Sequence, residues 1–179
     1  MPHIIQFTGL SGAGKTTLAY ALKTVLLAYT VDVDVVDGDE FRKTLCSDLG
    51  FSQADRMENI HRLAAYSAQR LTSHVVVIAA INPYEATRQA VAQLYQAKTV
   101  WVKCGLDELV RRDTKGLYRR ALLPEGHENR LANLSGVNDR YEEPRCPDLV
   151  IETDKQTKET CIDLLARFTL HLLRGGSQP

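Results

Sequence analysis

The 179-residue chain has no excess charge of either sign, because 22 Lys and Arg residues balance 22 Asp and Glu residues. This balance argues against bulk nucleic acid or an anionic membrane surface as the main partner. No stretch reaches the roughly 20 apolar residues of a membrane-spanning helix. The first residues, MPHII, also lack a basic segment followed by an apolar signal region. We therefore expect a cytoplasmic protein.

Cysteine pairs of the metal-binding or redox type are also missing. The four cysteines are Cys46, Cys104, Cys146 and Cys161, and their spacing matches neither C-x-x-C nor a zinc site. We expect reduced thiols without a disulfide. The rest of the composition, 44% hydrophobic and 25% charged, is ordinary for a globular protein. The length suits a single domain, residues 1–179.

Short apolar runs alternate with segments of helical spacing. The runs cover residues 3–8, 31–36, 74–81, 99–104 and, more weakly, 149–151. The third run is apolar without alternation, which is typical of a strand buried on both faces. Strand–helix alternation predicts parallel β-α-β units. The helical faces include Leu18, Leu22, Val25 and Leu26, then Ile60, Leu63, Ala64 and Leu71, and finally Ile162, Leu165, Phe168 and Thr169.

A phosphate-binding loop is the clearest motif. It matches G-x-x-x-x-G-K-[ST], lies between an expected strand and an expected helix at residues 16–28, and so has the context that this motif requires. Glycine turns and a helix N-terminus present N–H groups to phosphate oxygens. We expect Lys15 to reach the β- and γ-phosphates and Thr16 to ligate Mg²⁺. The loop residues are Gly9, Leu10, Ser11, Gly12, Ala13, Gly14, Lys15 and Thr16.

With this loop, the strand–helix order predicts an α/β fold of the P-loop NTPase type. We expect a three-layer α/β/α sandwich with a parallel five-stranded sheet. Residues 111–147 break the alternation, since they are polar, basic and without a sustained apolar stripe. In a phosphoryl-transfer enzyme such a segment would act as a lid that excludes water, here over residues 113–144. The tail, residues 174–179, is expected to fray.

Two carboxylates follow the second run. Asp37 and Asp39 stand at its end, with Arg42 one turn later. Ligands bind beyond the carboxyl ends of parallel strands, so both carboxylates should face the phosphate loop. One could hold Mg²⁺ through water and another could orient or deprotonate an attacking hydroxyl. The alternative for Asp39 is a helix cap without a chemical role.

A second group of polar residues follows. Ser52 with Asp55 could begin a helix as a modified capping box. Arg56, Asn59 and Arg62 recur every three residues and would share one face. Such a face suits an acceptor with an anionic group of its own, although a solvated helix face is the plainer alternative. Phe51, in a polar connection next to Gly50, could stack on a base.

Together these motifs follow a specific order along most of the chain. They are Gly9–Thr16, Asp37–Asp39 with Arg42, Asp48–Ser52, Asp55–Arg56, Glu58–Ile60, Arg112–Asp113, Lys115–Tyr118, Gly136–Asp139 and Tyr141–Pro144. Each short motif is weak, but their shared order and spacing are specific. From about Ile5 to Thr153 the chain resembles the adenylylsulfate kinase family, which uses MgATP to phosphorylate the 3′-hydroxyl of adenosine 5′-phosphosulfate (APS) in sulfate assimilation.

The resemblance implies a role for individual residues. Lys15 and Asp39 would be catalytic, with Asp39 beside the acceptor hydroxyl. ATP would bind the phosphate loop together with Thr17 and Arg112, and Mg²⁺ would bind Thr16 and Asp37. The residues implied to bind the acceptor are Asp39, Arg42, Phe51, Arg56, Asn59, Ile81, Asn82, Lys115 and Leu134. Members of the family often dimerise, so a homodimer is possible.

Four departures from the family pattern concern mainly the acceptor. The family usually has Ser-Pro where this chain has Asn82-Pro83, so a phosphoserine cannot form there. It usually has Phe-Thr-Gly in the lid where this chain has Leu134-Ser135-Gly136, which loses an aromatic stacking term of roughly 1 kcal/mol. Residues 122–133 make the lid several residues longer. His61 and Arg140 replace a common arginine and proline.

Three functions remain open from the sequence. One is an APS kinase with loosened acceptor contacts. Another is a related kinase that phosphorylates a different nucleotide-linked acceptor, for example in surface-polysaccharide synthesis. A non-catalytic nucleotide-binding module is a third, although it would be expected to lose Lys15, Thr16 or the carboxylates. A GTPase would need an N-K-x-D motif, which the sequence lacks.

Overall fold

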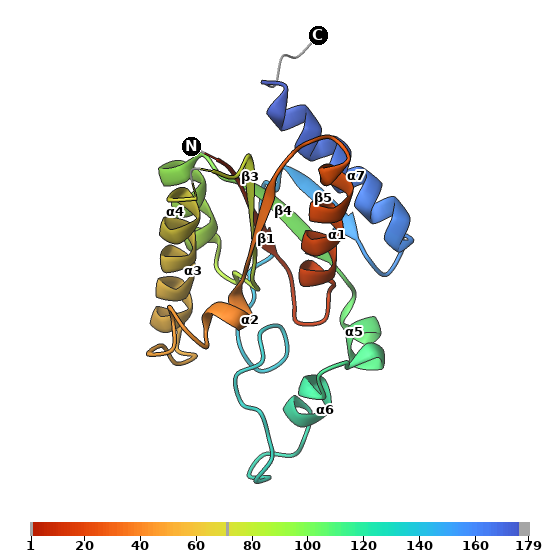
Figure 1. Cartoon of the computed structure of the whole chain (residues 1–179). Coiled ribbons are helices and arrows are strands. Elements are labelled where there is room, and N and C mark those ends of the chain that lie inside the picture. The colour runs from red at the N-terminus through yellow and green to blue at the C-terminus, as the bar shows by residue number, and fades with distance from the viewer. Residues whose placement is uncertain (1, 71, 176–179) are drawn as a thin grey trace.

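Five parallel strands form the middle layer of the protein, as Figure 1 shows. The structure, a computed structural model, describes residues 2–70 and 72–175. The strands lie in the order β2-β3-β1-β4-β5, so β1 is central and the expected five-stranded parallel sheet is confirmed. Their bounds are β1 His3–Thr8, β2 Val33–Asp37, β3 Val75–Ala79, β4 Lys98–Lys103 and β5 Leu149–Glu152.

Helices cover both faces of this sheet. On one face lie α1 (Lys15–Leu27) and α7 (Lys158–Leu173), and on the other lie α3 (Gln53–Ala68) and α4 (Glu85–Tyr95). All five residues of β3 are buried, which explains why its sequence is apolar without alternation. The structure therefore has the expected α/β/α layers.

Each face has its own core because successive strand residues point to opposite sides. Ile5 and Phe7 pack with the apolar side of α1, while Ile4 packs with that of α3. Ile60, Leu63 and Ala64 are buried as expected, whereas Leu71 lies outside the described residues. Val25 was predicted to lie on the buried face of α1 with Leu18, Leu22 and Leu26, but it is 37% exposed. Of the tail, residues 176–179 also lie outside the described residues.

The third run was predicted to remain a strand through Ile81, but β3 ends at Ala79. The carbonyl of Ile81 still accepts a hydrogen bond from the Gly9 amide, and the backbone then turns at Asn82, whose φ is 45°. The chain therefore leaves the sheet beside the phosphate loop. This turn brings residues 80–83 to the carboxyl ends of the central strands.

The remaining elements gather at the same end of the sheet. They are the short helix α2 (Gly38–Phe41), α5 (Leu106–Arg112) and α6 (Leu117–Ala121). The segment 113–144 extends beyond the carboxyl ends of the strands, with α6 and a bridge between Ser135 and Asp139 as its regular structure (Figure 1). Among the described residues, no helix is long and apolar enough to cross a membrane.

Candidate active site

The phosphate loop connects β1 to α1, and its geometry depends on glycine. Gly12 and Gly14 have φ values of 78° and 101°, in the left-handed region that other residues rarely adopt. A Cβ atom at Gly9 would overlap the carbonyl oxygen of Val102 on β4. The loop therefore lies tightly against the sheet, with its backbone turned as a phosphate cradle requires.

Lys15 is the first residue of α1 and lies inside this loop. Its side chain is 8% exposed, and Nζ donates to the carbonyl oxygens of Gly9 and Leu10 at 2.8 and 2.7 Å. Burial lowers the pKa of the Lys15 ammonium to about 8, against the opposing influence of the Asp39 charge. The ammonium is thus held at the place where bound phosphates would replace carbonyls as its partners.

Thr16 and Asp37 are joined across the mouth of the loop. The Thr16 hydroxyl donates to Oδ2 of Asp37 at 2.7 Å, and Oδ1 of Asp37 accepts the Asp39 amide at 2.8 Å. The residue that caps α2 is therefore Asp37, and not Asp39 as the alternative from sequence held. The hydroxyl and carboxylate oxygens of Thr16 and Asp37 fit Mg²⁺, which takes few protein ligands and completes its shell with phosphate and water.

A cavity of about 230 Å³ opens in front of these residues. Its lining includes Thr17, both carboxylates at the end of β2, and five loop residues, Ser11, Gly12, Gly14, Lys15 and Thr16. The predicted loop residues Gly9, Leu10 and Ala13 do not line it. Arg112, also predicted to bind ATP, does not line it. Its guanidinium donates to Glu108 and to the carbonyl of Thr153 at 2.7 and 2.9 Å.

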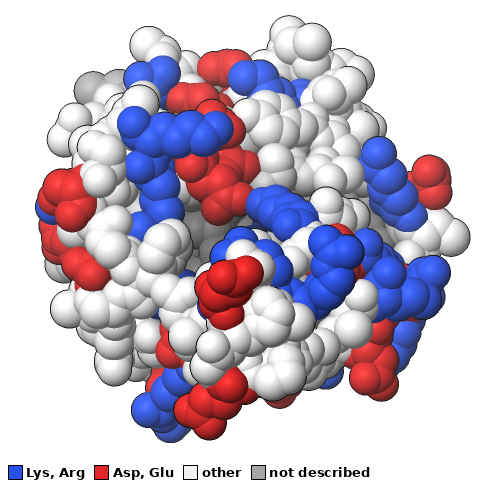
Figure 2. All heavy atoms as spheres, turned by 90° about the horizontal axis from the view of Figure 1, so that it is seen from below, with Lys and Arg blue, Asp and Glu red and all other residues white. Residues whose placement is uncertain are grey.

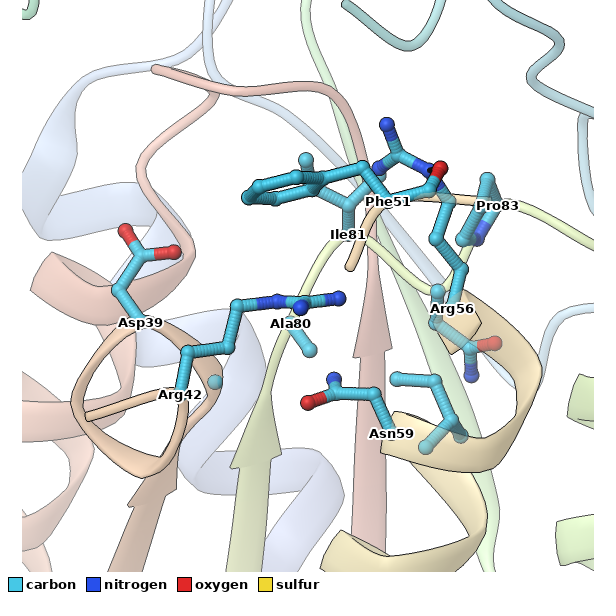
Figure 3. Close-up of a pocket in the computed structure, with 11 residues that line it drawn as sticks. Asp39, Arg42, Phe51, Arg56, Asn59, Ala80, Ile81 and Pro83 are labelled. Atoms are coloured by element: carbon cyan, nitrogen blue, oxygen red, sulfur yellow. Dashed lines mark hydrogen bonds between the residues drawn. The ribbon is translucent and has the colours of Figure 1, made fainter. Parts of the chain in front are cut away.

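A second cavity of about 300 Å³ adjoins the first, and Figure 3 shows its labelled side chains. Both cavities are lined by Asp39, Ala80 and Ile81, so they meet at these residues. Most of the predicted acceptor residues come together here. Those that line the second cavity are Asp39, Arg42, Phe51, Arg56, Asn59, Ile81 and Asn82.

The aromatic and basic side chains of this cavity stack on one another. Phe51 is 54% exposed, and the guanidinium carbons of Arg42 and Arg56 lie 4.6 and 5.5 Å from its ring centroid. In Figure 3 the side chains of Arg42 and Asn59 point toward each other beneath the ring. An exposed ring face and two cations suit a flat base joined to an anionic group.

Helix α3 contributes Arg56 and Asn59 to this cavity because of how it begins. Ser52 and Asp55 form the predicted capping box, which fixes the first turn. Arg56 and Asn59 are then buried, 8% and 5% exposed. Arg62 was expected on the same face but points elsewhere, where it pairs with Asp48 at 2.6 Å and with Glu58.

The predicted lid, residues 113–144, contacts residues that line both cavities. Apart from Lys115, sequence reasoning had assigned these lid residues no role. Lys115 lies 2.5 Å from Asp39, while Asp139 pairs with Arg56 at 3.0 Å. Tyr118 is buried and its hydroxyl donates to the carbonyl of Ser11 in the phosphate loop at 2.7 Å. Tyr118 and Asp139 belong to motifs of the family resemblance, which is the only signal that could have found them.

Leu134 was predicted to contact the acceptor but lies elsewhere. It is 5% exposed within the hydrophobic core and lines neither cavity. Gly136, two residues later, has a φ of 85° and leaves no room for a Cβ beside the Leu10 side chain. The lid therefore packs its Leu134 turn on the phosphate loop instead of presenting it to the second cavity.

Charged side chains surround the opening of the site. Figure 2 shows the end of the molecule that carries the lid, with Lys, Arg, Asp and Glu side chains gathered around a central hollow. Two adjoining cavities, a phosphate loop and convergent cations define a P-loop kinase with a donor site and an acceptor site.

The comparisons with known proteins identify the family. Residues 1–152 match the family model described as adenylylsulphate kinase. The chain is 43% identical over 164 residues to the adenylyl-sulfate kinase of Synechococcus sp. (strain JA-3-3Ab), which covers 90% of each chain. It is 40% identical over 171 residues to that of Geotalea uraniireducens (strain Rf4), covering 93% of this chain and 80% of the relative. The chain belongs to the adenylylsulphate kinase family.

A solved structure supports the same conclusion. The APS kinase of Mycobacterium tuberculosis, solved in complex with AMPPNP and APS, is 34% identical to this chain with a TM-score of 0.81. The alignment covers 92% of this chain and 97% of that one.

Proposed function

We propose that this protein transfers the γ-phosphate of MgATP to the 3′-hydroxyl of APS, giving 3′-phosphoadenosine 5′-phosphosulfate for sulfate assimilation. The observation that carries the proposal is the junction of the two cavities at Asp39. A donor phosphate over Lys15 and an acceptor hydroxyl beside Asp39 would meet there. The relatives' activity as adenylyl-sulfate kinases supports the same assignment.

On the donor side, the phosphate loop binds the triphosphate through backbone amides, and Thr17 lies in the same cavity. Lys15 neutralises the β- and γ-phosphates from within the loop. Thr16 and Asp37 would hold Mg²⁺, which would supply positive charge against the phosphate oxygens. The position of Arg112 at the edge of the donor site, on the Thr153 carbonyl, leaves its contact with ATP as a prediction.

On the acceptor side, Arg42, Arg56 and Asn59 hold the phosphosulfate and ribose, and Phe51 packs on the adenine. A phosphosulfate carries two negative charges, so two guanidinium groups match it. Asp39 orients the 3′-hydroxyl for attack on the γ-phosphate. Ile81 and Asn82 form the wall beneath the nucleotide.

Transfer is direct from ATP to the hydroxyl. At the position where relatives usually have serine, Asn82 offers an amide that cannot carry a phosphoryl group in this way. The amide Nδ2 already donates to Gln6 at 2.9 Å. In-line attack by the acceptor hydroxyl needs no enzyme-bound intermediate.

The lid completes the site when it closes. Lys115 contacts Asp39 at the junction of the two cavities, where it can neutralise phosphate charge. Water exclusion by the segment 113–144 would prevent loss of the phosphoryl group to solvent. A homodimer and a cytoplasmic location stay predictions, and sedimentation velocity would test the first of them.

The test is an ADP-release assay with MgATP and a panel of acceptors. The panel contains APS, AMP and several nucleoside-diphosphate conjugates. We expect turnover with APS far above that with AMP, because AMP lacks the sulfate that the arginines would bind. The buried position of Leu134 is the one observation that favours a different base or conjugate, and turnover of such a conjugate without APS turnover would support that alternative.

A further inference from the structure

Arg88 on α4 is the largest fully buried side chain among the described residues, at 2% exposure. It lines neither the donor nor the acceptor cavity. A guanidinium taken out of water is costly unless its donors are paired. The hydrogen-bond partners of the Arg88 guanidinium therefore indicate its role.

The shortest bonds of the guanidinium join it to three parts of the chain. Nη1 donates to the carbonyl of Asn82 at 2.8 Å, and Nη2 donates to the carbonyl of Glu142 at 2.7 Å. Glu85, one turn earlier on α4, accepts from Nε and Nη2 at 3.1 and 2.7 Å and balances the charge. One side chain thus connects the loop after β3 to the end of the lid.

Asn82 is held in an unfavourable backbone conformation by this network. Its φ of 45° is uncommon for a residue with a Cβ, and such conformations cost about 1–3 kcal/mol each. The Thr8 hydroxyl also donates to the Asn82 carbonyl at 3.0 Å, and the Asn82 amide donates to Gln6. Hydrogen bonds with Arg88, Thr8 and Gln6 therefore maintain the turn that places Ile81 in the acceptor cavity.

The end of the lid is fastened to the same turn. The Glu142 amide donates to the Pro83 carbonyl at 2.8 Å, and the Glu142 side chain accepts the Glu85 amide at 2.7 Å. The hydroxyls of Tyr141 and Thr8 lie 3.0 Å apart. The acceptor wall and the C-terminal end of the lid consequently form one connected unit with α4.

We propose that Arg88 is a positioning residue for the acceptor. It acts through the Asn82 and Glu142 carbonyls, which fix the acceptor wall and the point from which the lid closes, and it does not touch either substrate. This proposal rests on the proposed acceptor site, and it assigns a role to a residue that does not contact the nucleotide. Donor binding should depend on it much less, because none of the residues that the Arg88 side chain bonds lines the donor cavity.

The test compares Arg88→Lys and Arg88→Met with Thr87→Val. Thr87 is the neighbouring residue on α4, is 1% exposed, and has a buried hydroxyl without a hydrogen-bond partner among the described residues. We expect Arg88→Met to raise the KM for APS about tenfold or more, since small misplacements of reacting groups are costly. The dissociation constant for ADP should change less than about twofold, and Thr87→Val should change neither.

Arg88→Lys separates positioning from charge. A lysine keeps the cation beside Glu85, but a single ammonium cannot reproduce the planar fork that spans both carbonyls. We expect its KM defect for APS to persist, and the Glu142 amide to exchange its hydrogen faster while α1 amides stay protected. Full rescue by lysine, or a Tm loss with unchanged KM for APS, would overturn the proposal.

If Arg88→Met does not fold, Glu85→Gln provides the second measurement. It keeps the backbone amide that binds Glu142 and removes the charge that orients Arg88. A raised KM for APS with unchanged ADP affinity supports the proposal, and an unchanged KM contradicts it. The hydrogen-exchange measurement needs no turnover, so failure of the wild type to use APS would count against the proposed function alone.

Discussion

The Lys115 ammonium lies 2.5 Å from the Asp39 carboxylate, which joins the lid to the junction of the donor and acceptor cavities. Both side chains are more than half exposed, at 55% and 68%, so the pair adds little to stability. The pair matters for catalysis, because it holds the Lys115 ammonium where the phosphoryl group would be transferred. Substrate binding would redistribute this pair between the acceptor hydroxyl and the phosphate.

Asp39→Ala tests the acceptor side of this junction. We expect kcat to fall by about 100-fold or more, because a positioned carboxylate contributes this much in acid–base catalysis. The dissociation constant for MgATP should stay nearly unchanged, since Thr16 bonds to Asp37 instead. Glu40→Ala is the matched control, an exposed neighbour whose one ion pair among residues 2–70 and 72–175 is with Lys43. Loss of MgATP binding in Asp39→Ala would assign Asp39 chiefly to the metal.

Thr16→Val tests the metal site. It removes the hydroxyl that bonds Asp37 at 2.7 Å and would ligate Mg²⁺, with little change in side-chain volume. Calorimetry should show that the gain in ATP affinity on adding Mg²⁺ is largely lost, while ADP binding in EDTA is retained. Thr24→Val, on the exposed side of the same helix, should behave as wild type. A normal Mg²⁺ dependence in Thr16→Val would exclude Thr16 as a ligand.

Phe51→Leu tests aromatic recognition of the base. We expect the KM for APS to rise about fivefold, because the aromatic stacking term is worth about 1 kcal/mol. The Phe51 side chain is already 54% exposed, so the Tm should hardly change. Tyr20→Leu, a half-exposed aromatic on α1, is the control for a general loss of surface aromatic area. An unchanged KM would place the adenine elsewhere.

Tyr118→Phe tests how the lid is attached to the phosphate loop. The change removes a buried hydrogen bond to the Ser11 carbonyl and should lower the free energy of unfolding by about 1–3 kcal/mol. We also expect faster hydrogen exchange in α6. Tyr29→Phe, which is exposed, should leave both unchanged. If Tyr118→Phe matched the Tyr29 variant, the lid would be held by its other contacts.

The parallel sheet with helices on both faces could be anticipated from the apolar runs along the sequence, and the reasons are physical. Uninterrupted apolar runs such as that of β3 occur where both faces are covered, which predicts a parallel sheet with helices on each side. The end of β3 could not be predicted, because Ala80 and Ile81 are as apolar as the strand itself. Two of the bonds at its end, from Thr8 and Gly9 to the Ile81 carbonyl, come from residues more than 70 positions away in the sequence.

The site was predictable where a motif determines local geometry and less so where tertiary packing decides. Lys15 and Thr16 follow from the loop, and Arg56 from its helical spacing after a capping box. Arg62 has the same spacing, but it forms ion pairs with Asp48 and Glu58 and does not line the acceptor cavity. Leu134 depends on how the lid folds over Leu10, which no local pattern encodes.

The most direct test of the function is the turnover of APS itself. The wild-type protein is incubated with MgATP and APS, ADP release is followed, and the nucleotide product is identified by mass and by phosphorus NMR. We predict one product for each ADP, carrying the new phosphate on the 3′-hydroxyl. ADP release with another nucleotide conjugate and none with APS would contradict the assignment.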